Sequence, residues 1–118
     1  MRDPVRSVEM KELPDIVDAS RGREFLSELK KGMPSDHPCI VLDCSKVQHM
    51  DSAAIYLMLC CLEEAILRNG DVKLTGVSAG AKVILEQTGV SSIFESFDSK
   101  ESAINSFHHS RKDVASLA

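Results

Sequence analysis

Apolar and polar residues follow two different periods along the chain, and the changes between them predict its elements. Short alternating or continuous apolar runs predict strands in four segments, 7–13, 39–45, 71–77 and 91–97. The almost wholly apolar start of segment 39–45 also predicts burial on both faces, as in a sheet covered by helices. A spacing of three or four residues predicts helices over 19–32, 52–69, 79–89 and 99–112. Such alternation of strands and helices predicts a single α/β domain with a mainly parallel sheet.

Residues that favour helix ends stand at the limits of these segments. Asp18 and Ser78 each precede a predicted helix, where a side-chain oxygen accepts hydrogen bonds from the first-turn amides. Asp98 and Glu101 form a capping pair before the last helix. Asn69-Gly70 is typical of the residues that end a helix. The predicted boundaries therefore agree with the apolar periodicity.

The helix predicted after Ser52 is unusually apolar, because Ala53 to Leu62 contains no polar residue other than tyrosine and cysteine. Steps of 100° per residue centre its core side on Ile55, Leu59, Leu62 and Ile66. Glu64 and Arg68 then mark the solvent side. On or beside that polar side lie Tyr56, Leu57, Cys60 and Cys61. We expect this surface to bind a partner protein, or else to be covered by a neighbouring element or a second copy in a homodimer.

Asp51 and Ser52 lie at the end of the loop that joins the apolar strand to this helix. Either side chain is suited to cap the first turn, and capping alone explains the residue types. A helix N-terminus also favours anions, so a phosphate on Ser52 would be tolerated there while adding about -1.5 to -2 charge. The residues alone therefore leave open a plain cap and a phosphorylation switch.

The composition limits the classes of partner and compartment. With 118 residues, 43% hydrophobic and 27% charged, the chain fits one globular domain. Its net charge of -4 offers no basic surface for nucleic acid or an anionic membrane. The sequence has no secretory h-region and no apolar stretch of the roughly 18 to 20 residues that spans a bilayer. Together with four cysteines that suit a reducing compartment, this predicts a cytoplasmic protein.

Enzymatic and metal-binding motifs are not found in the sequence. It contains no glycine-rich phosphate loop, no His-Glu-x-x-His and no paired Cys-x-x-Cys. The cysteine pairs Cys39 with Cys44 and Cys60 with Cys61 are not spaced as metal ligands. His49 is near enough to Ser52 in sequence to orient its hydroxyl, but no oxyanion site or substrate pocket is indicated. We therefore expect no enzyme, no cofactor and no metal site.

The stretch "CIVLDCSKVQHMDSAAIYLMLCCLEEAILRNGDVKLTGVSAGAKVILEQTGVSSIFESF" resembles the STAS family, shared by sulphate-transporter tails and bacterial anti-sigma factor antagonists. The resemblance is clearest over 39–107 of a single domain spanning 1–118, in the strand ending at Asp43, the "MDS" loop, "RNGDVKLTGV" and "LEQTGV". It implies a mixed, mainly parallel sheet with helices mainly on one face.

Antagonists of this family carry Asp, Ser or Thr, Ser or Thr, and Gly in the equivalent loop, with the hydroxyl after the Asp phosphorylated by a partner kinase. Asp51 matches the Asp and Ser52 the phosphoacceptor, while Ala53 and Ala54 replace the second hydroxyl and the glycine. The resemblance implies a non-enzymatic module of signal transduction and transcription regulation that binds an anti-sigma factor or serine kinase. The partner-binding residues would be Asp51, Ser52, Tyr56, Leu57, Cys60 and Cys61.

Two other functions fit the same resemblance. Some STAS proteins are subunits of membrane transporters, of the ABC or sulphate-permease type, and dock on an ATPase or permease without phosphorylation. Ala53 and Ala54 fit that function slightly better than they fit a switch. A light- or stress-sensing assembly of STAS domains is the third alternative.

Overall fold

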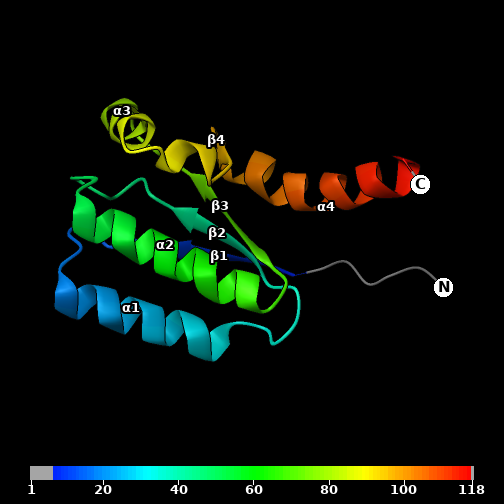
Figure 1. Cartoon of the computed structure of the whole chain (residues 1–118), viewed down its shortest axis with the longest axis horizontal. Helices are drawn as coiled ribbons and strands as arrows, with labels where there is room; N and C mark the ends of the chain where they lie inside the picture. The colour runs from blue at the N-terminus through cyan, green and yellow to red at the C-terminus, as the bar shows by residue number, and fades with distance from the viewer. Residues whose placement is uncertain (1–6, 118) are drawn as a thin grey trace.

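The computed structural model describes the backbone of residues 7–117 and the side chains of residues 7–108. Its elements are β1 (Val8–Glu12), α1 (Ala19–Gly32), β2 (Cys39–Asp43), α2 (Ser52–Leu67), β3 (Asp71–Thr75), α3 (Ala79–Gln87), the 3-10 helix η1 (Val90–Ser92), β4 (Ser96–Phe97) and α4 (Lys100–Leu117). Strands and helices alternate along the chain (Figure 1), so the predicted α/β class is confirmed.

The four strands form one sheet in the order β1-β2-β3-β4, and all the pairs are parallel. The expected mixed sheet is therefore wrong for the described residues. The physical reason lies in the connections, because each strand is followed by a helix that carries the chain back before the next strand begins. Right-handed connections that step in one direction place their helices on the same face of the sheet.

Each face of the sheet has its own apolar cluster. On one face Ile40 and Leu42 of β2 pack with the buried residues of α1, α2 and α3. On the other, Cys39 and Val41 pack against Ala103 and Phe107 of α4. The helices α1 to α3 thus lie on one face, as expected, while α4 covers the second face. All five residues of β2 are buried, which confirms the prediction that both its faces are covered.

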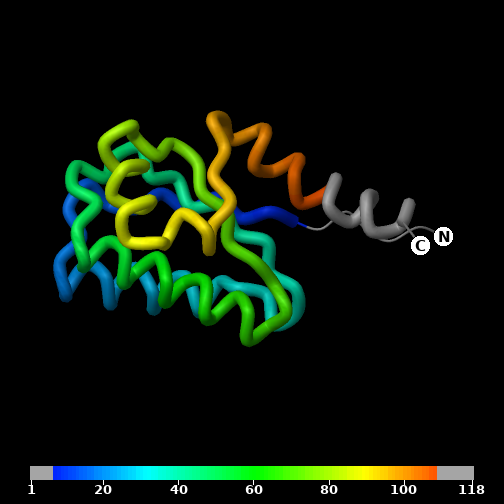
Figure 2. The backbone as a smooth tube through the Cα atoms, turned by 45° about the horizontal axis from the view of Figure 1, so that its top comes forward, coloured from blue at the N-terminus to red at the C-terminus, as the bar shows by residue number. Residues whose placement is uncertain are grey.

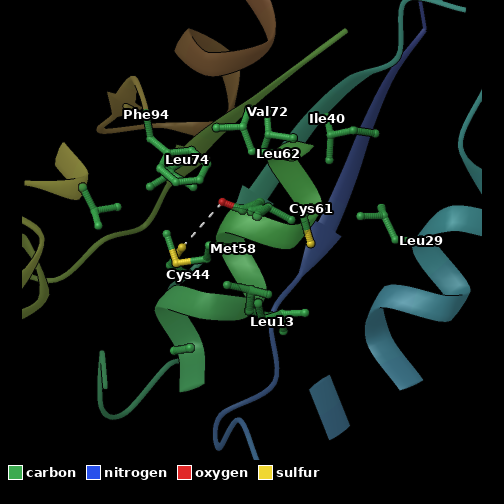
Figure 3. Packing of buried hydrophobic residues seen from close by; sticks show 14 of the residues in the cluster. Leu13, Leu29, Ile40, Cys44, Met58, Cys61, Leu62, Val72, Leu74 and Phe94 are labelled. Atoms are coloured by element: carbon green, nitrogen blue, oxygen red, sulfur yellow. Dashed lines mark hydrogen bonds between the residues drawn. The ribbon is translucent and has the colours of Figure 1, made fainter. Parts of the chain in front are cut away.

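The helix α2 faces the sheet with a different side than the sequence predicted. Its buried residues are Ala54, Leu57, Met58, Cys61, Leu62 and Ala65. Figure 3 shows Met58, Cys61 and Leu62 among strand residues that include Ile40 and Val72. The predicted core side was one residue, about 100°, away, and Ile66 from that side is 57% exposed. The small side chains of Ala54 and Ala65 let the helix approach the sheet along that line, so a count of large apolar residues misplaces its centre.

The end of α2 satisfies its last carbonyl groups with a two-bond turn. Asn69 adopts a positive φ of 64°, its amide donates to Ile66 O at 2.9 Å, and the Gly70 amide donates to Ala65 O at 2.8 Å. A Cβ at Gly70 would stand 2.1 Å from Pro38 O, so only glycine fits beside the start of β2. The predicted Asn69-Gly70 helix end is confirmed.

Besides the Asp51–Ser52 start, three helix starts were predicted from capping residues, and the last of these differs. Asp18 and Ser78 accept hydrogen bonds from the amides of Arg21 and Ala81, as predicted. At α4 the Ser102 amide donates to Ser99 Oγ at 3.1 Å, so Ser99 takes the place assigned to Asp98. The Asp98 side chain is fully exposed and lies 3.8 Å from the Lys82 ammonium. Ser99 is one residue closer to the first helical turn, which decides between the two.

The strand predicted over 91–97 is shorter than expected. Val90 begins the 3-10 helix η1, and only Ser96 and Phe97 pair with β3. Val90 and Phe94 are both buried in the main cluster, and the Phe94 amide points to Val90 O at 3.4 Å. Their spacing of four residues suits a helical turn better than an extended strand, so burial of this pair fixes the local conformation.

Candidate functional site

The loop before α2 holds Asp51 and Ser52 at the surface by anchoring the residues around them. The Gln48 amide donates to Asp15 O at 3.0 Å, and Met50 is buried in the main cluster. Asp51 is the N-cap, with extended backbone, and its Oδ1 accepts the Ala54 amide at 3.0 Å. Ser52 follows as the first residue of α2, exposed to solvent. The cap is therefore made by the aspartate, which leaves the serine hydroxyl outside that bond.

A solvent-facing stripe runs along α2 from Ser52. One turn on lies Tyr56, whose side chain is 71% exposed, and two further turns on lies the exposed Glu63. Leu67, near the helix end, is 73% exposed. A large aromatic ring one turn from a helix-terminal serine gives this surface both an apolar contact and a modifiable hydroxyl.

The structure brings together four of the residues predicted to bind a partner and removes two from the surface. Asp51, Ser52 and Tyr56 are exposed, and Cys60 is half-buried beside them. The prediction that Leu57 and Cys61 lie at the surface is wrong, since both are buried against the sheet and α1 side of the core. Their burial follows from the rotation of α2 described above.

The thiols of α2 differ in their surroundings. Burial, together with neighbouring Cys60, raises the pKa of the Cys61 thiol to about 12. A side-chain hydrogen bond and the charge of Cys60 raise the pKa of the Tyr56 phenol, with smaller contributions from burial and Glu63. Tyr56 and Cys60 thus interact on adjacent turns of α2.

An apolar groove lies between α1 and α2, and the first residue of α2 that lines it is Ala53, which follows Ser52. Figures 1 and 2 show the two helices side by side and running in the same direction. The groove has a volume of about 290 Å³ and is lined by Asp18, Ala19, Gly22, Arg23, Leu26, Ala53, Tyr56, Leu57 and Cys60. Farther along the two helices, Lys30 and Glu64 form an ion pair at 3.7 Å. Hereafter this is called the α1–α2 groove.

Sequence reasoning missed the part that α1 contributes to this site. Residues 18–26 have only the pattern of an ordinary amphipathic helix, and the glycine within it, Gly22, is a residue that lowers helix stability. The spacing of Ala19, Gly22, Arg23 and Leu26 places them on one face. The only indication of the groove in the sequence was that both helices carry small and apolar residues at this helical spacing. Which helices are neighbours depends on the order of the strands in the sheet, and the sequence pattern does not give that order.

A second, larger hollow of about 860 Å³ lies at the end of β1, and both apolar and charged residues line it. Two ion pairs lie within its lining, Arg21 with Asp15 and Lys46 with Glu12, each at 3.2 Å. No three His, Cys, Asp or Glu side chains within the described part of the chain are grouped as metal ligands. Both cations of this lining, Arg21 and Lys46, are therefore already paired with carboxylates of the same hollow.

His49, considered as a partner of the Ser52 hydroxyl, is exposed in the loop. Across residues 7–108, whose side chains are described, no hydrogen bond joins it to Ser52. Among the helices of the described segment, none is both long and apolar enough to cross a membrane.

One known domain family matches most of this chain. The model of the STAS domain matches residues 10–103. The chain belongs to the STAS domain family. The match begins within β1 and includes α1, so it extends farther towards the N-terminus than the motifs in the sequence indicated. A search of curated proteins found no match for this STAS domain.

Proposed function

We propose that this STAS domain is a cytoplasmic, non-enzymatic interaction module of the anti-sigma factor antagonist type. Its partner is an anti-sigma factor or serine kinase, bound through the Asp51–Ser52 loop and the exposed side of α2. The observation that carries the proposal is the exposed Ser52 on the first turn of α2, one turn before Tyr56, while Asp51 supplies the cap through its bond to the Ala54 amide.

Phosphorylation of Ser52 would act on binding more than on folding. The free first-turn amides and the positive end of the α2 dipole favour an anion at this place. A phosphate would add about -1.5 to -2 charge next to the Asp51 carboxylate. Like charges and a bulky hydrated group at the edge of an interface oppose the approach of an acidic or apolar partner surface. The modified form would therefore release the partner.

The test is phosphorylation and binding with a candidate anti-sigma kinase encoded beside the gene for this chain. Incubation with ATP is expected to add one phosphate, located to Ser52 by mass spectrometry and lost in Ser52→Ala. Ser52→Asp is expected to weaken binding in calorimetry. Ser102→Asp is the matched control, because Ser102 is also an exposed serine in the first turn of a helix, in this case α4 on the opposite face of the sheet. Equal binding by Ser52→Asp and the parent would refute the switch.

The transporter function has one observation in its favour. Residues 53 and 54 are alanines, so no second hydroxyl follows Ser52. Ala54 is completely buried, and Ala53 lines the α1–α2 groove. A subunit that docks on a transporter ATPase or permease needs no such hydroxyl. This function predicts that Ser52→Asp leaves docking on the ATPase unchanged and that no kinase modifies the chain. A pull-down with the purified ATPase or permease domain distinguishes it from the antagonist function.

A further inference from the structure

We propose that the α1–α2 groove receives one apolar side chain of the anti-sigma or kinase partner, flanked on the partner by a carboxylate that pairs with Arg23. The inference rests on the proposed function and extends its interface from α2 to α1. Four features of the groove lead to it: its size, its glycine, its charge and its position beside Ser52.

The size of the groove suits a side chain better than a free ligand. Its volume of about 290 Å³ is at the lower limit of small-molecule pockets, which begin near ~300 Å³. It is nevertheless roughly ten times the share of one water in the liquid. An apolar hollow of this size that opens to the surface corresponds to the pocket in which a buried anchor residue of a protein interface is held.

Gly22 keeps the groove open without being needed for the backbone. It lies inside α1, where glycine lowers helix stability relative to alanine. A Cβ at Gly22 would have Val17 Cγ1, at 3.9 Å, as its nearest neighbour, which is an ordinary contact. Local structure would therefore accept a larger residue with a gain in stability. The absent side chain instead leaves room for a group from outside the molecule.

The charges at the rim indicate what accompanies that group. Arg23 is exposed and forms no ion pair with the residues that the structure describes. The Asp18 carboxylate, which lines the same groove, is held at the start of α1 by the Arg21 amide and forms no ion pair with Arg23 among the described residues. The cation at the groove is therefore available to a partner, and a carboxylate next to the inserted side chain is its complement.

The groove is continuous with the proposed switch. Ala53 lines it, and Ser52 is the residue immediately before Ala53 on the first turn of α2. A phosphate on Ser52 would therefore repel the partner carboxylate that Arg23 attracts. The phosphate would therefore act on one defined group, the partner carboxylate, which Arg23 attracts and the phosphate repels.

The decisive variant fills the groove with a leucine at position 22. Gly22→Leu is expected to weaken partner binding by about tenfold or more in calorimetry, while the thermal midpoint stays equal to or above that of the parent. Gly32→Leu is the matched control, because Gly32 lies on the same helix with no atom within 4 Å of its added Cβ and outside the groove. Arg23→Glu is expected to weaken binding and to reduce its salt dependence, whereas Lys31→Glu, outside the groove, is not.

Cys60 reports whether the groove is occupied. It is the half-buried cysteine in the groove wall, while Cys39, Cys44 and Cys61 are buried. Its alkylation by N-ethylmaleimide, followed by mass spectrometry, is expected to slow in the complex and also in free Gly22→Leu. If Gly22→Leu protects Cys60 from alkylation but binds the partner with unchanged affinity, the groove is not the binding place.

The outcomes separate the two proposals. If Ser52→Asp weakens binding but Gly22→Leu does not, the groove inference fails and the proposed function stands. Absence of any binding by the kinase partner defeats both. The competing occupant of the groove is a second copy of this chain, and sedimentation tests it. If the parent is a dimer and Gly22→Leu is a monomer, the groove belongs to the second copy and the inference is overturned.

Discussion

The ammonium group of Lys73 lies 4.4 Å from the ring centre of Phe107, beneath α4 on the inner strand β3. The lysine side chain is only 3% exposed. Its Nζ donates to Ser106 Oγ at 2.9 Å and lies 3.2 Å from a Glu95 carboxylate oxygen. This buried cation thus joins the sheet to the last helix, and a buried charge is stable only while such partners surround it.

Lys73 and Phe107 are expected to show a coupling free energy of about 0.5 to 2 kcal/mol in a double-mutant cycle. Lys73→Met and Phe107→Leu preserve most of the side-chain volume, so the cycle isolates the cation–ring contact. Urea unfolding of the four proteins measures it. A parallel cycle of Lys73→Met with Glu95→Gln serves as a comparison, because the Glu95 side chain is 65% exposed. A coupling within experimental error of zero for Phe107 would contradict the expectation.

Asp43 is expected to make folding more acid-sensitive. Burial by itself raises its pKa, but hydrogen bonds from Ser45 and the nearby Lys100 lower it below the ordinary value of 3.8. A lowered folded-state pKa contributes stability at neutral pH that is lost as the pH falls from about 4 through the folded-state value. The free-energy difference between the parent and Asp43→Asn should therefore shrink between pH 7 and pH 3. Urea unfolding of both proteins at each pH measures this difference, and a difference that stays constant would contradict the expectation.

The orientation of α2 can be tested by truncating one residue on each side. Met58→Ala is expected to reduce the free energy of unfolding by about 2 to 5 kcal/mol, because Met58 is completely buried. Ile66→Ala should reduce it by less than about 1 kcal/mol, because Ile66 is 57% exposed. Equal losses in urea unfolding would instead favour the side of the helix that apolar periodicity selected.

Asp51 caps α2 and the Ser52 hydroxyl does not, so alanine substitutions at the two positions should change the free energy of unfolding by different amounts. Asp51→Ala removes the bond from Oδ1 to the Ala54 amide and should cost about 0.5 to 2 kcal/mol. Ser52→Ala should change stability by less than about 0.5 kcal/mol, as at other exposed positions. Thermal unfolding at equal protein concentration measures both. A larger loss at Ser52 would mean that its hydroxyl is structural.

Alkylation of the native protein is expected to be selective for Cys60. Burial and the charge of Asp43 raise the pKa of the Cys44 thiol to about 12, and that of Cys61 is raised to a similar value. The thiolate is the reacting form, so at pH 8 both should react much more slowly than the half-buried Cys60. Time-resolved peptide mapping measures the rates. Similar rates in urea but not in buffer would confirm that the fold causes the difference.

The sequence by itself determined the order of the helices and strands, apart from the short η1 helix, and the place of the Asp51–Ser52 loop. Asp18, Ser78 and Asn69-Gly70 were identified as helix ends because capping is a local interaction between residues a few positions apart. The burial of β2 on both faces followed from its apolar run. Ser52 could likewise be placed at a helix start, because the strand, the loop and the helix are contiguous in sequence.

Only the tertiary structure decided which side of α2 meets the core and what lies beside it. The helix α2 carries apolar residues on most of its sides, so apolar periodicity could not identify the side that faces the sheet. The close approach to the sheet that Ala54 and Ala65 allow set the rotation of the helix. That rotation buries Leu57 and Cys61 and leaves Tyr56 outside. The α1–α2 groove was beyond sequence reasoning for a related reason: residues 18–26 and 53–60 become neighbours only when parallel strands β1 and β2 pair and bring their following helices together.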